Sequence, residues 1–280
     1  MLRLVSCYSN SFGPDGVTVA VRSLAAIGLK DVELALRPHD FGGLVIPESA
    51  VITERTSEPV VLEFLELLEK IGVRISGCNV GGGDLRTLEG LEITASRMRF
   101  ASRTFGAGLA VSGAGQPTNP EERAVVIRHL KSLGDLADEL GMDLSLETHK
   151  GPTQNARAML ALMNDVDHPR VRLNFDTGNI AFYNQGADPV AELDQVKHLV
   201  RSVHLKDNRG GFEDWFFPPL GDGGAVSFVR VREILDGVGF KGPYTIELEG
   251  IGGEPEPGLE VRQSRVARSV DHLRSCGYFD

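Results

Sequence analysis

The stretches MDLSLETH at residues 142–149 and VRLNFD at residues 171–176 decide the fold, because each alternates apolar and polar side chains. Successive side chains of a strand point to opposite faces, so each stretch predicts a strand with one apolar and one polar face. Glu147 in the first stretch and Asp176 in the second lie on the polar face near the end of the strand.

The same alternation recurs in SVHLKD at residues 202–207 and in YTIELEG at residues 244–250, which place His204 and Glu247 on the polar face. Working outward from these four stretches, shorter apolar runs complete a set of eight predicted strands. The predicted strands cover residues 3–7, 32–36, 73–79, 108–112, 142–148, 171–176, 202–206 and 244–249.

Helical patterns separate the strands. The clearest helix begins at the N-cap Asn119, has Pro120 in its first turn and stops at Gly141. Asp188 and Ser227 are expected to open two further helices. Eight strand–helix units of about 35 residues each predict an α/β protein with a single (β/α)₈ TIM barrel domain over residues 1–280. A doubly wound open sheet is the alternative, because periodicity alone does not distinguish the two.

Composition narrows the class of function. Hydrophobic residues make up 41% of the chain and charged residues 24%, which is typical of a globular protein. The net charge of -10 argues against a nucleic-acid partner, because such proteins need a clustered positive surface. The three cysteines show no disulfide or thiolate-metal spacing, and the N-terminus shows no signal peptide or membrane span. We therefore expect a cytoplasmic protein without a membrane partner.

Four inward polar residues carry side chains that bind metals, namely Glu147, Asp176, His204 and Glu247. They lie 29, 28 and 43 residues apart, about one strand–helix unit each, so they should be neighbours at the C-terminal ends of barrel strands. Three converging carboxylates repel one another unless a counter-charge is present. The pattern predicts one divalent metal ion. Oxygen and imidazole ligands suit Mn²⁺, Mg²⁺, Co²⁺ or Fe²⁺, and Zn²⁺ is compatible.

Five motifs occur in order along the chain: LSLETH (144–149), FDTGN (175–179), HLKDNRG (204–210), PLGDGG (219–224) and YTIELEG (244–250). Together they resemble the xylose isomerase-like TIM barrel superfamily, which includes sugar-phosphate isomerases, ketose 3-epimerases, inosose dehydratases and endonuclease IV repair enzymes. The resemblance covers nearly the whole chain. It implies a small carbohydrate-like substrate and a homo-oligomer, since relatives are commonly dimers or tetramers.

In the epimerase-like members, the two metal-binding glutamates also move protons on opposite faces of the substrate. The resemblance implies those catalytic roles for Glu147 and Glu247. Abstraction of a proton next to a carbonyl needs a base at the carbon and a cation near the oxygen of the developing enediolate. We therefore expect a metal-dependent isomerase or epimerase that acts on a sugar, sugar acid or cyclitol.

Further residues are expected to contact the substrate, each with an alternative role in a salt bridge at the rim. Trp215 lies in a loop predicted to cover the site, with packing on a neighbouring helix or subunit as the alternative. The expected substrate-binding residues are His149, Asn179, Lys206, Arg209, Glu33 and Trp215.

Two departures from the family pattern leave the reaction open. Ketose 3-epimerases have a histidine three residues after the metal-binding aspartate and a glutamate six residues after the first ligand, whereas this chain has Asn179 and Thr153. The runner-up is a lyase, either inosose dehydratase-like or a 3-keto-sugar eliminase, because the same base and metal can expel a β-substituent. An endonuclease IV-like phosphodiesterase and a non-catalytic sugar-binding protein are the remaining alternatives.

Overall fold

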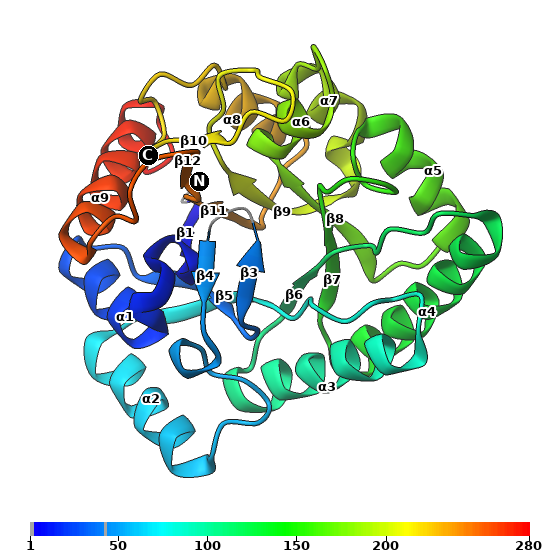
Figure 1. Ribbon diagram of the computed structural model, residues 1–280, viewed down its shortest axis with the longest axis horizontal. Coiled ribbons are helices and arrows are strands. Elements are labelled where there is room, and N and C mark those ends of the chain that lie inside the picture. Colours follow the sequence, from blue (N-terminus) through cyan, green and yellow to red (C-terminus); the bar gives the residue numbers. More distant parts are fainter. Residues whose placement is uncertain (1–2, 42–43) are drawn as a thin grey trace.

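Eight parallel strands close into a barrel in the computed structural model, which describes residues 3–41 and 44–280 (Figure 1). The order around the barrel is β1-β11-β9-β8-β7-β6-β5-β2, and β1 pairs with both β11 and β2. This closure confirms the predicted (β/α)₈ barrel and excludes the open sheet. The strands are β1 (Leu4–Tyr8), β2 (Asp31–Ala35), β5 (Arg74–Asn79), β6 (Leu109–Ser112), β7 (Asp143–Glu147), β8 (Val171–Asp176), β9 (Val200–Leu205) and β11 (Pro243–Ile246).

The helices surround the barrel on its outside (Figure 1). Local capping explains several of their ends: the Asn119 side chain accepts a hydrogen bond from the Glu122 amide at 2.8 Å, and Gly72 ends its helix at a φ of 67°. The helices are α1 (Gly16–Ala26), α2 (Glu58–Ile71), α3 (Leu88–Phe105), α4 (Pro120–Glu139), α5 (Ala156–Val166), α6 (Thr177–Tyr183), α7 (Pro189–Val196), α8 (Phe228–Gly237) and α9 (Leu259–Ser275), with 3₁₀ turns η1 (Ser9–Asp15), η2 (Glu48–Ala50) and η3 (Lys197–Leu199).

Strand alternation sorts the side chains as the sequence predicts. Leu144 and Leu146 of β7 are fully buried in the apolar layer between barrel and helices. On the opposite face, Ser145, Asn174 and Ser202 are also fully buried, although they are polar. The barrel interior is therefore polar on the strands that lead to the predicted metal ligands.

Two short ribbons supplement the barrel and were not predicted. β3 (His39–Phe41) and β4 (Leu44–Ile46) form an antiparallel hairpin after β2. β10 (Phe216–Phe217) pairs with β12 (Gly250–Ile251), so the loop after β9 is joined to the loop after β11. The two loops are held as one wall beside the barrel mouth.

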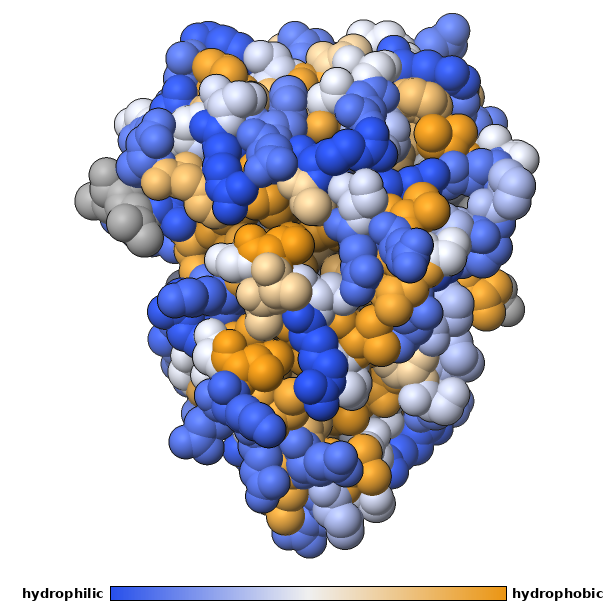
Figure 2. Space-filling model, turned by 90° about the vertical axis from the view of Figure 1, so that its left-hand side faces the viewer, coloured by the Kyte–Doolittle hydropathy of each residue, from blue (hydrophilic) through white to orange (hydrophobic). Residues whose placement is uncertain are grey.

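Figure 2 shows the face on the left of Figure 1, where α1, α2 and α9 lie. Hydrophilic side chains cover much of this face, and apolar ones are visible in several patches between them. Each helix directs its apolar stripe at the barrel, as Val61, Phe64 and Leu68 of α2 illustrate. No helix in the described part of the chain is long and apolar enough to cross a bilayer.

Candidate metal centre

The four predicted ligands meet at the C-terminal mouth of the barrel. Glu147 ends β7, Asp176 ends β8, His204 is the penultimate residue of β9 and Glu247 directly follows β11. One ligand atom from each lies within 4.8 Å of the others, and all four residues are buried. Four consecutive strands around the barrel thus bring together residues that span 100 positions of the sequence.

The Asp176 carboxylate is held by the first turn of α6. Its Oδ1 accepts hydrogen bonds of 2.9 Å from the backbone amides of Gly178 and Asn179. This N-cap leaves Oδ2 directed towards the Lys206 ammonium, 3.1 Å away. The start of the helix fixes one oxygen and presents the other to the centre.

The His204 imidazole is fixed from both sides. Nδ1 faces the cluster, 2.9 Å from Glu247 Oε2 and 3.3 Å from Glu147 Oε1. Nε2 faces away and lies 3.1 Å from both carboxylate oxygens of Glu33. The Tyr8 ring stacks on the imidazole at 5.6 Å between centroids. Glu33, which we expected to contact the substrate, lies fully buried behind His204.

The arrangement fits a divalent cation. Ligand atoms at about 2.0–2.2 Å from a cation are separated from one another by roughly 3–4 Å, and the ligand atoms of the four side chains already lie within 4.8 Å of one another. Three carboxylates and one neutral imidazole are the donor set that hard and borderline cations prefer. The second imidazole nitrogen is bonded to a carboxylate, as is usual for a ligating histidine.

Lys206 is the buried cation of the centre. Its ammonium lies 3.0 Å from Glu247 Oε2 and 3.0 Å from Glu249 Oε2, in addition to Asp176. The Phe217 ring lies 5.0 Å from the ammonium. Despite the burial, these carboxylates raise the pKa of Lys206 well above its ordinary value, so the side chain is charged.

The acids of the centre differ in proton affinity. Burial raises the pKa of Asp176 to about 7. Burial also opposes ionisation of Glu247, but Lys206 and His204 hold the pKa of this carboxylate well below its ordinary value. The pKa of Glu147 is lowered in the same sense by the His149 and His204 imidazoles. Glu147 and Glu247 are therefore ionised at neutral pH.

His149 borders the cluster on the solvent side. Its Nδ1 lies 3.8 Å from Glu147 Oε1, and its side chain is 37% exposed. The Tyr183 ring packs against the imidazole at 5.7 Å. Burial lowers the pKa of His149, so the neutral imidazole predominates. Thr153, the residue that replaces the family's glutamate, donates a 2.6 Å hydrogen bond to the Glu147 carbonyl.

Asn179 and Arg209 occupy different environments. Asn179 is buried and donates to the Thr148 carbonyl at 2.9 Å, with its Oδ1 3.5 Å from the Lys206 ammonium. Arg209 is 56% exposed, forms an ion pair with Asp214 and lies over the Phe216 ring at 4.4 Å. Asn179 thus lies at the centre, whereas Arg209 lies on the outer loop.

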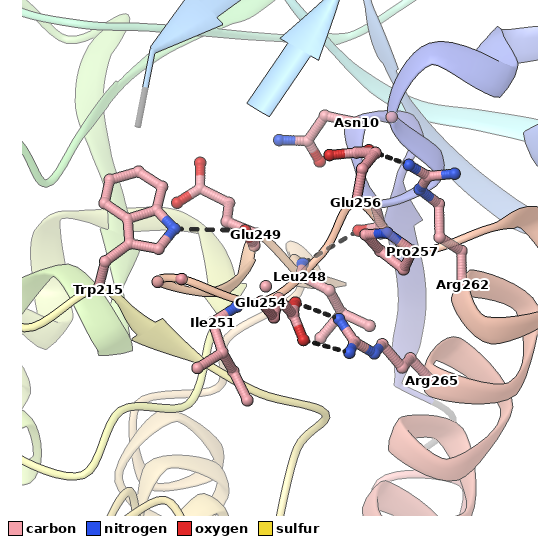
Figure 3. Close-up of a pocket in the computed structure, with 15 residues that line it drawn as sticks. Asn10, Trp215, Leu248, Glu249, Ile251, Glu254, Glu256, Pro257, Arg262 and Arg265 are labelled. Atoms are coloured by element: carbon pink, nitrogen blue, oxygen red, sulfur yellow. Dashed lines mark hydrogen bonds and ion pairs between the residues drawn. The ribbon is translucent and has the colours of Figure 1, made fainter. Parts of the chain in front are cut away.

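Trp215 belongs to the wall formed by β10 and β12. Its indole contacts the rings of Phe182 in α6 at 5.6 Å and Phe217 at 5.1 Å. The indole N–H donates to the Glu249 carbonyl, and the Glu249 carboxylate lies on the same side of the pocket as the Trp215 ring (Figure 3). These contacts place Trp215 against the neighbouring helix α6. Packing on a helix was the alternative that we gave to a loop covering the site.

Sequence reasoning missed two residues of the centre. Asn10, in the turn after β1, donates a 2.8 Å hydrogen bond to Glu247 Oε1. Glu249 is a partner of the Lys206 ammonium. Glu249 shares the polar face of its strand with Glu247, which was a usable signal, whereas no local pattern distinguishes Asn10.

This set of ligands on four successive strands can be compared with known proteins. The family described as xylose isomerase-like TIM barrel matches residues 21–276. The chain belongs to this family. The predicted resemblance is confirmed over nearly the whole chain.

Similar curated proteins are sugar and cyclitol enzymes. Inosose dehydratase of Clostridium beijerinckii is 30% identical over 79% of this chain and 74% of its own length. Inosose dehydratase of Geobacillus thermodenitrificans is 32% identical over 51% of this chain, and the match spans about half (53%) of that protein. A putative L-ribulose-5-phosphate 3-epimerase of Shigella dysenteriae is 29% identical over 63% of this chain and 62% of its own length.

Similar solved structures share the fold. A xylose isomerase-like TIM barrel protein from Mycobacterium smegmatis, in complex with magnesium, has a TM-score of 0.73 at 20% identity and covers 98% of this chain and 97% of its own. A D-allulose 3-epimerase from Methylomonas has a TM-score of 0.74 at 15% identity and covers 98% of both chains.

Proposed function

We propose that the protein is a divalent-metal-dependent isomerase or epimerase that moves a proton next to the carbonyl of a small polyhydroxylated substrate. The observation that carries this proposal is the position of Glu147 and Glu247, which lie 3.3 Å and 2.9 Å from the same imidazole nitrogen. Two ionised carboxylates that come from separate strands can act on a substrate from two sides. The substrate class is a sugar, sugar acid or cyclitol.

Each side chain has a distinct task in this reaction. Glu147 and Glu247 can each take the proton from a substrate carbon as a base, and the carboxyl group that has gained the proton then returns it as the acid. Asn10 orients Glu247 through its 2.8 Å hydrogen bond, so the second oxygen of that carboxylate remains at the centre. A bound divalent cation would supply positive charge for the oxygen that becomes negative when the proton leaves.

Lys206 supports the same charge change. Its ammonium is buried between the carboxylates of Asp176, Glu247 and Glu249 and would exchange one of these contacts for a hydrogen bond to a substrate oxygen. An ammonium in a site with little water stabilises a developing oxyanion more than it would in bulk solvent.

A lyase is the second candidate, and His149 favours it. Elimination of a hydroxyl needs a proton donor near the base, and the His149 imidazole, which donates in its protonated form, lies 3.8 Å from Glu147. The similarity to two inosose dehydratases supports this alternative. A phosphodiesterase is less well supported: in the described residues one group of four side chains can hold a cation, and endonuclease IV-like chemistry needs several metals.

Isotope exchange distinguishes the two reactions. The Mn²⁺-loaded protein is incubated with candidate ketoses and inososes in D₂O. Deuterium incorporation with a retained carbon skeleton and no loss of water is expected for an isomerase or epimerase, whereas an unsaturated product identifies a lyase.

Substitution of the bases tests the assignment. Glu147→Gln and Glu247→Gln are each expected to lower kcat by at least about 100-fold, because general acid–base catalysis contributes about 10²–10⁴-fold. Glu139→Gln changes the same group on the exposed side of α4 and is the matched control. Full activity of Glu247→Gln would mean that this carboxylate is not a catalytic acid or base.

A further inference from the structure

Arg37 is a cation at the barrel mouth whose charge no described acid neutralises. It follows β2 by two residues. In the order around the barrel, β2, β5 and β6 lie in the half opposite the four ligand strands. Arg37 therefore lies on the side of the mouth opposite those strands.

The Arg37 side chain is held through one of its nitrogens. Nε donates a 3.2 Å hydrogen bond to Oδ1 of Asn79, the last residue of β5. Cδ lies 3.1 Å from the position that a Cβ on Gly82 would occupy, so the glycine leaves room for the stem. Among the side chains that the structure describes, in residues 3–39 and 45–280, no carboxylate forms an ion pair with Arg37. The two terminal amino groups of the guanidinium are available to a ligand.

Other buried arginines near the mouth differ in this respect. Arg97, which also contacts the loop of residues 81–83, is paired with Glu54 at 3.1 Å. Arg262 and Arg265 line the pocket of about 120 Å³ beside Trp215, and each is paired with a glutamate (Figure 3). A half-buried arginine normally has such a partner, because an unpaired charge loses hydration without compensation.

Geometry places Arg37 at the same end of the barrel as the centre. It follows Glu33 of β2 by four residues, and both Glu33 carboxylate oxygens lie 3.1 Å from the His204 imidazole. Asn79, the last residue of β5, holds the Arg37 side chain at this end of the barrel. We therefore expect the remote end of a molecule bound at the centre to reach the guanidinium.

We propose that Arg37 binds an anionic group at the end of the substrate that is remote from the reacting carbons. This inference rests on the proposed function and narrows its substrate class to sugar acids or sugar phosphates. The planar guanidinium with two free amino groups matches a carboxylate or a phosphate through two parallel hydrogen bonds. Ser112 Oγ lies 3.5 Å from the Cβ position of Gly81 and adds a hydroxyl to the same wall.

Three unreactive polyols of equal carbon number test the proposal by binding alone: ribitol, ribonate and ribitol 5-phosphate. Their affinities for the Mn²⁺-loaded protein are measured by calorimetry. At least one of the two anions is expected to bind about tenfold or more tightly than ribitol, because hydrogen bonds between charged groups are the strong ones. Tighter binding of ribonate indicates a carboxylate site, and tighter binding of ribitol 5-phosphate indicates a phosphate site.

Arg37→Gln is expected to bring the preferred anion to within about twofold of ribitol, and Arg37→Lys to retain part of the preference. Arg74→Gln removes the same charge at the opposite end of β5, where Arg74 is 70% exposed, and should keep the wild-type preference. A Mn²⁺ titration of each variant shows whether the metal centre is intact. Three results would each overturn the proposal. The first is equal affinity for ribitol and both anions, and the second is no detectable binding of either anion. The third is an anion preference that survives in Arg37→Gln. If only the D₂O exchange fails, the proposed isomerase or epimerase function is contradicted, whereas a measured anion preference that depends on Arg37 still supports the anion site.

Discussion

Glu33 lies behind the His204 imidazole, and both of its carboxylate oxygens are 3.1 Å from Nε2. An acceptor in this position holds the Nε2–H tautomer and leaves the Nδ1 lone pair for a cation. We interpret Glu33 as a positioning residue, because Tyr8 and His204 separate it from the open mouth.

Glu33→Gln is therefore expected to weaken Mn²⁺ binding by about 10- to 100-fold, the usual cost of losing an outer-shell partner. A neutral amide accepts a weaker hydrogen bond and can present its NH₂ group to Nε2 instead. Calorimetric titration with Mn²⁺ measures the affinity, with Glu139→Gln as control. An unchanged affinity would show that packing alone orients the imidazole.

Metal binding is expected to release protons. Although burial disfavours the charged imidazole, Glu33 and Glu247 raise the pKa of His204 well above its ordinary value, and burial raises the pKa of Asp176 to about 7. Both groups must lose a proton before they can ligate. Apparent Mn²⁺ affinity should therefore rise with pH and fall as the pH drops through about 7. Titrations at about pH 6 and about pH 8, in buffers of different ionisation enthalpy, measure the proton count. A pH-independent affinity without proton release would contradict these protonation states.

At the scale of elements, the PLGDGG turn shows how a family motif can serve the structure. The Asp207 carboxylate accepts hydrogen bonds from the backbone amides of Gly221 at 2.8 Å and Val226 at 3.2 Å. A Cβ on Gly224 would lie 1.8 Å from Asp207 Oδ1. The turn is wrapped around a buried carboxylate next to the β9 ligand strand, and only glycine allows this approach.

Gly224→Ala is accordingly expected to destabilise the protein by at least about 2 kcal/mol, since overpacking of a filled site costs about 1–3 kcal/mol. Gly237→Ala is the matched control: nothing lies within 4 Å of its Cβ position in α8, and alanine favours a helix by up to about 1 kcal/mol. Urea denaturation compares the free energies of unfolding. Equal stabilities of the two variants would mean that the turn yields to the extra methyl group.

At the scale of the whole molecule, the centre joins four strands from the second half of the chain to β1 and β2 from the first. Glu33 contacts His204 across 171 positions, and Asn10 contacts Glu247 across 237 positions. A cation bound here therefore stabilises the closed barrel as a whole, because the unfolded chain has no preformed site.

At a Mn²⁺ concentration of about 100 times Kd, binding should add about 2.7 kcal/mol of stability. For a chain of this length, that corresponds to an increase of about 4–5 °C in Tm. Thermal unfolding with EDTA and with Mn²⁺, Mg²⁺, Co²⁺, Fe²⁺ or Zn²⁺ measures the increase, and Asp176→Asn should abolish it. No increase with any of the five metals would rule out the predicted metal centre.

Local patterns in the sequence by themselves determined the eight strands, their inward faces and the polar positions of the four predicted ligands. The period of two in MDLSLETH and VRLNFD follows from backbone geometry, so it predicts which side of its strand Glu147 or Asp176 occupies without knowledge of the partner strands. The strand limits shifted by one or two residues at most ends, and β11 stops at Ile246, so Glu247 extends from the loop that follows the strand.

Only the tertiary structure decided what surrounds those ligands. Closure of the sheet through β1 and β11 brings Asn10 to Glu247, and the pairing of β2 with β1 brings Glu33 under His204. The same closure sets Arg37 opposite the metal centre. These contacts join residues that are far apart in sequence. Which distant side chain lies beside a particular residue depends on how the whole barrel closes. Local periodicity carries no information about that closure.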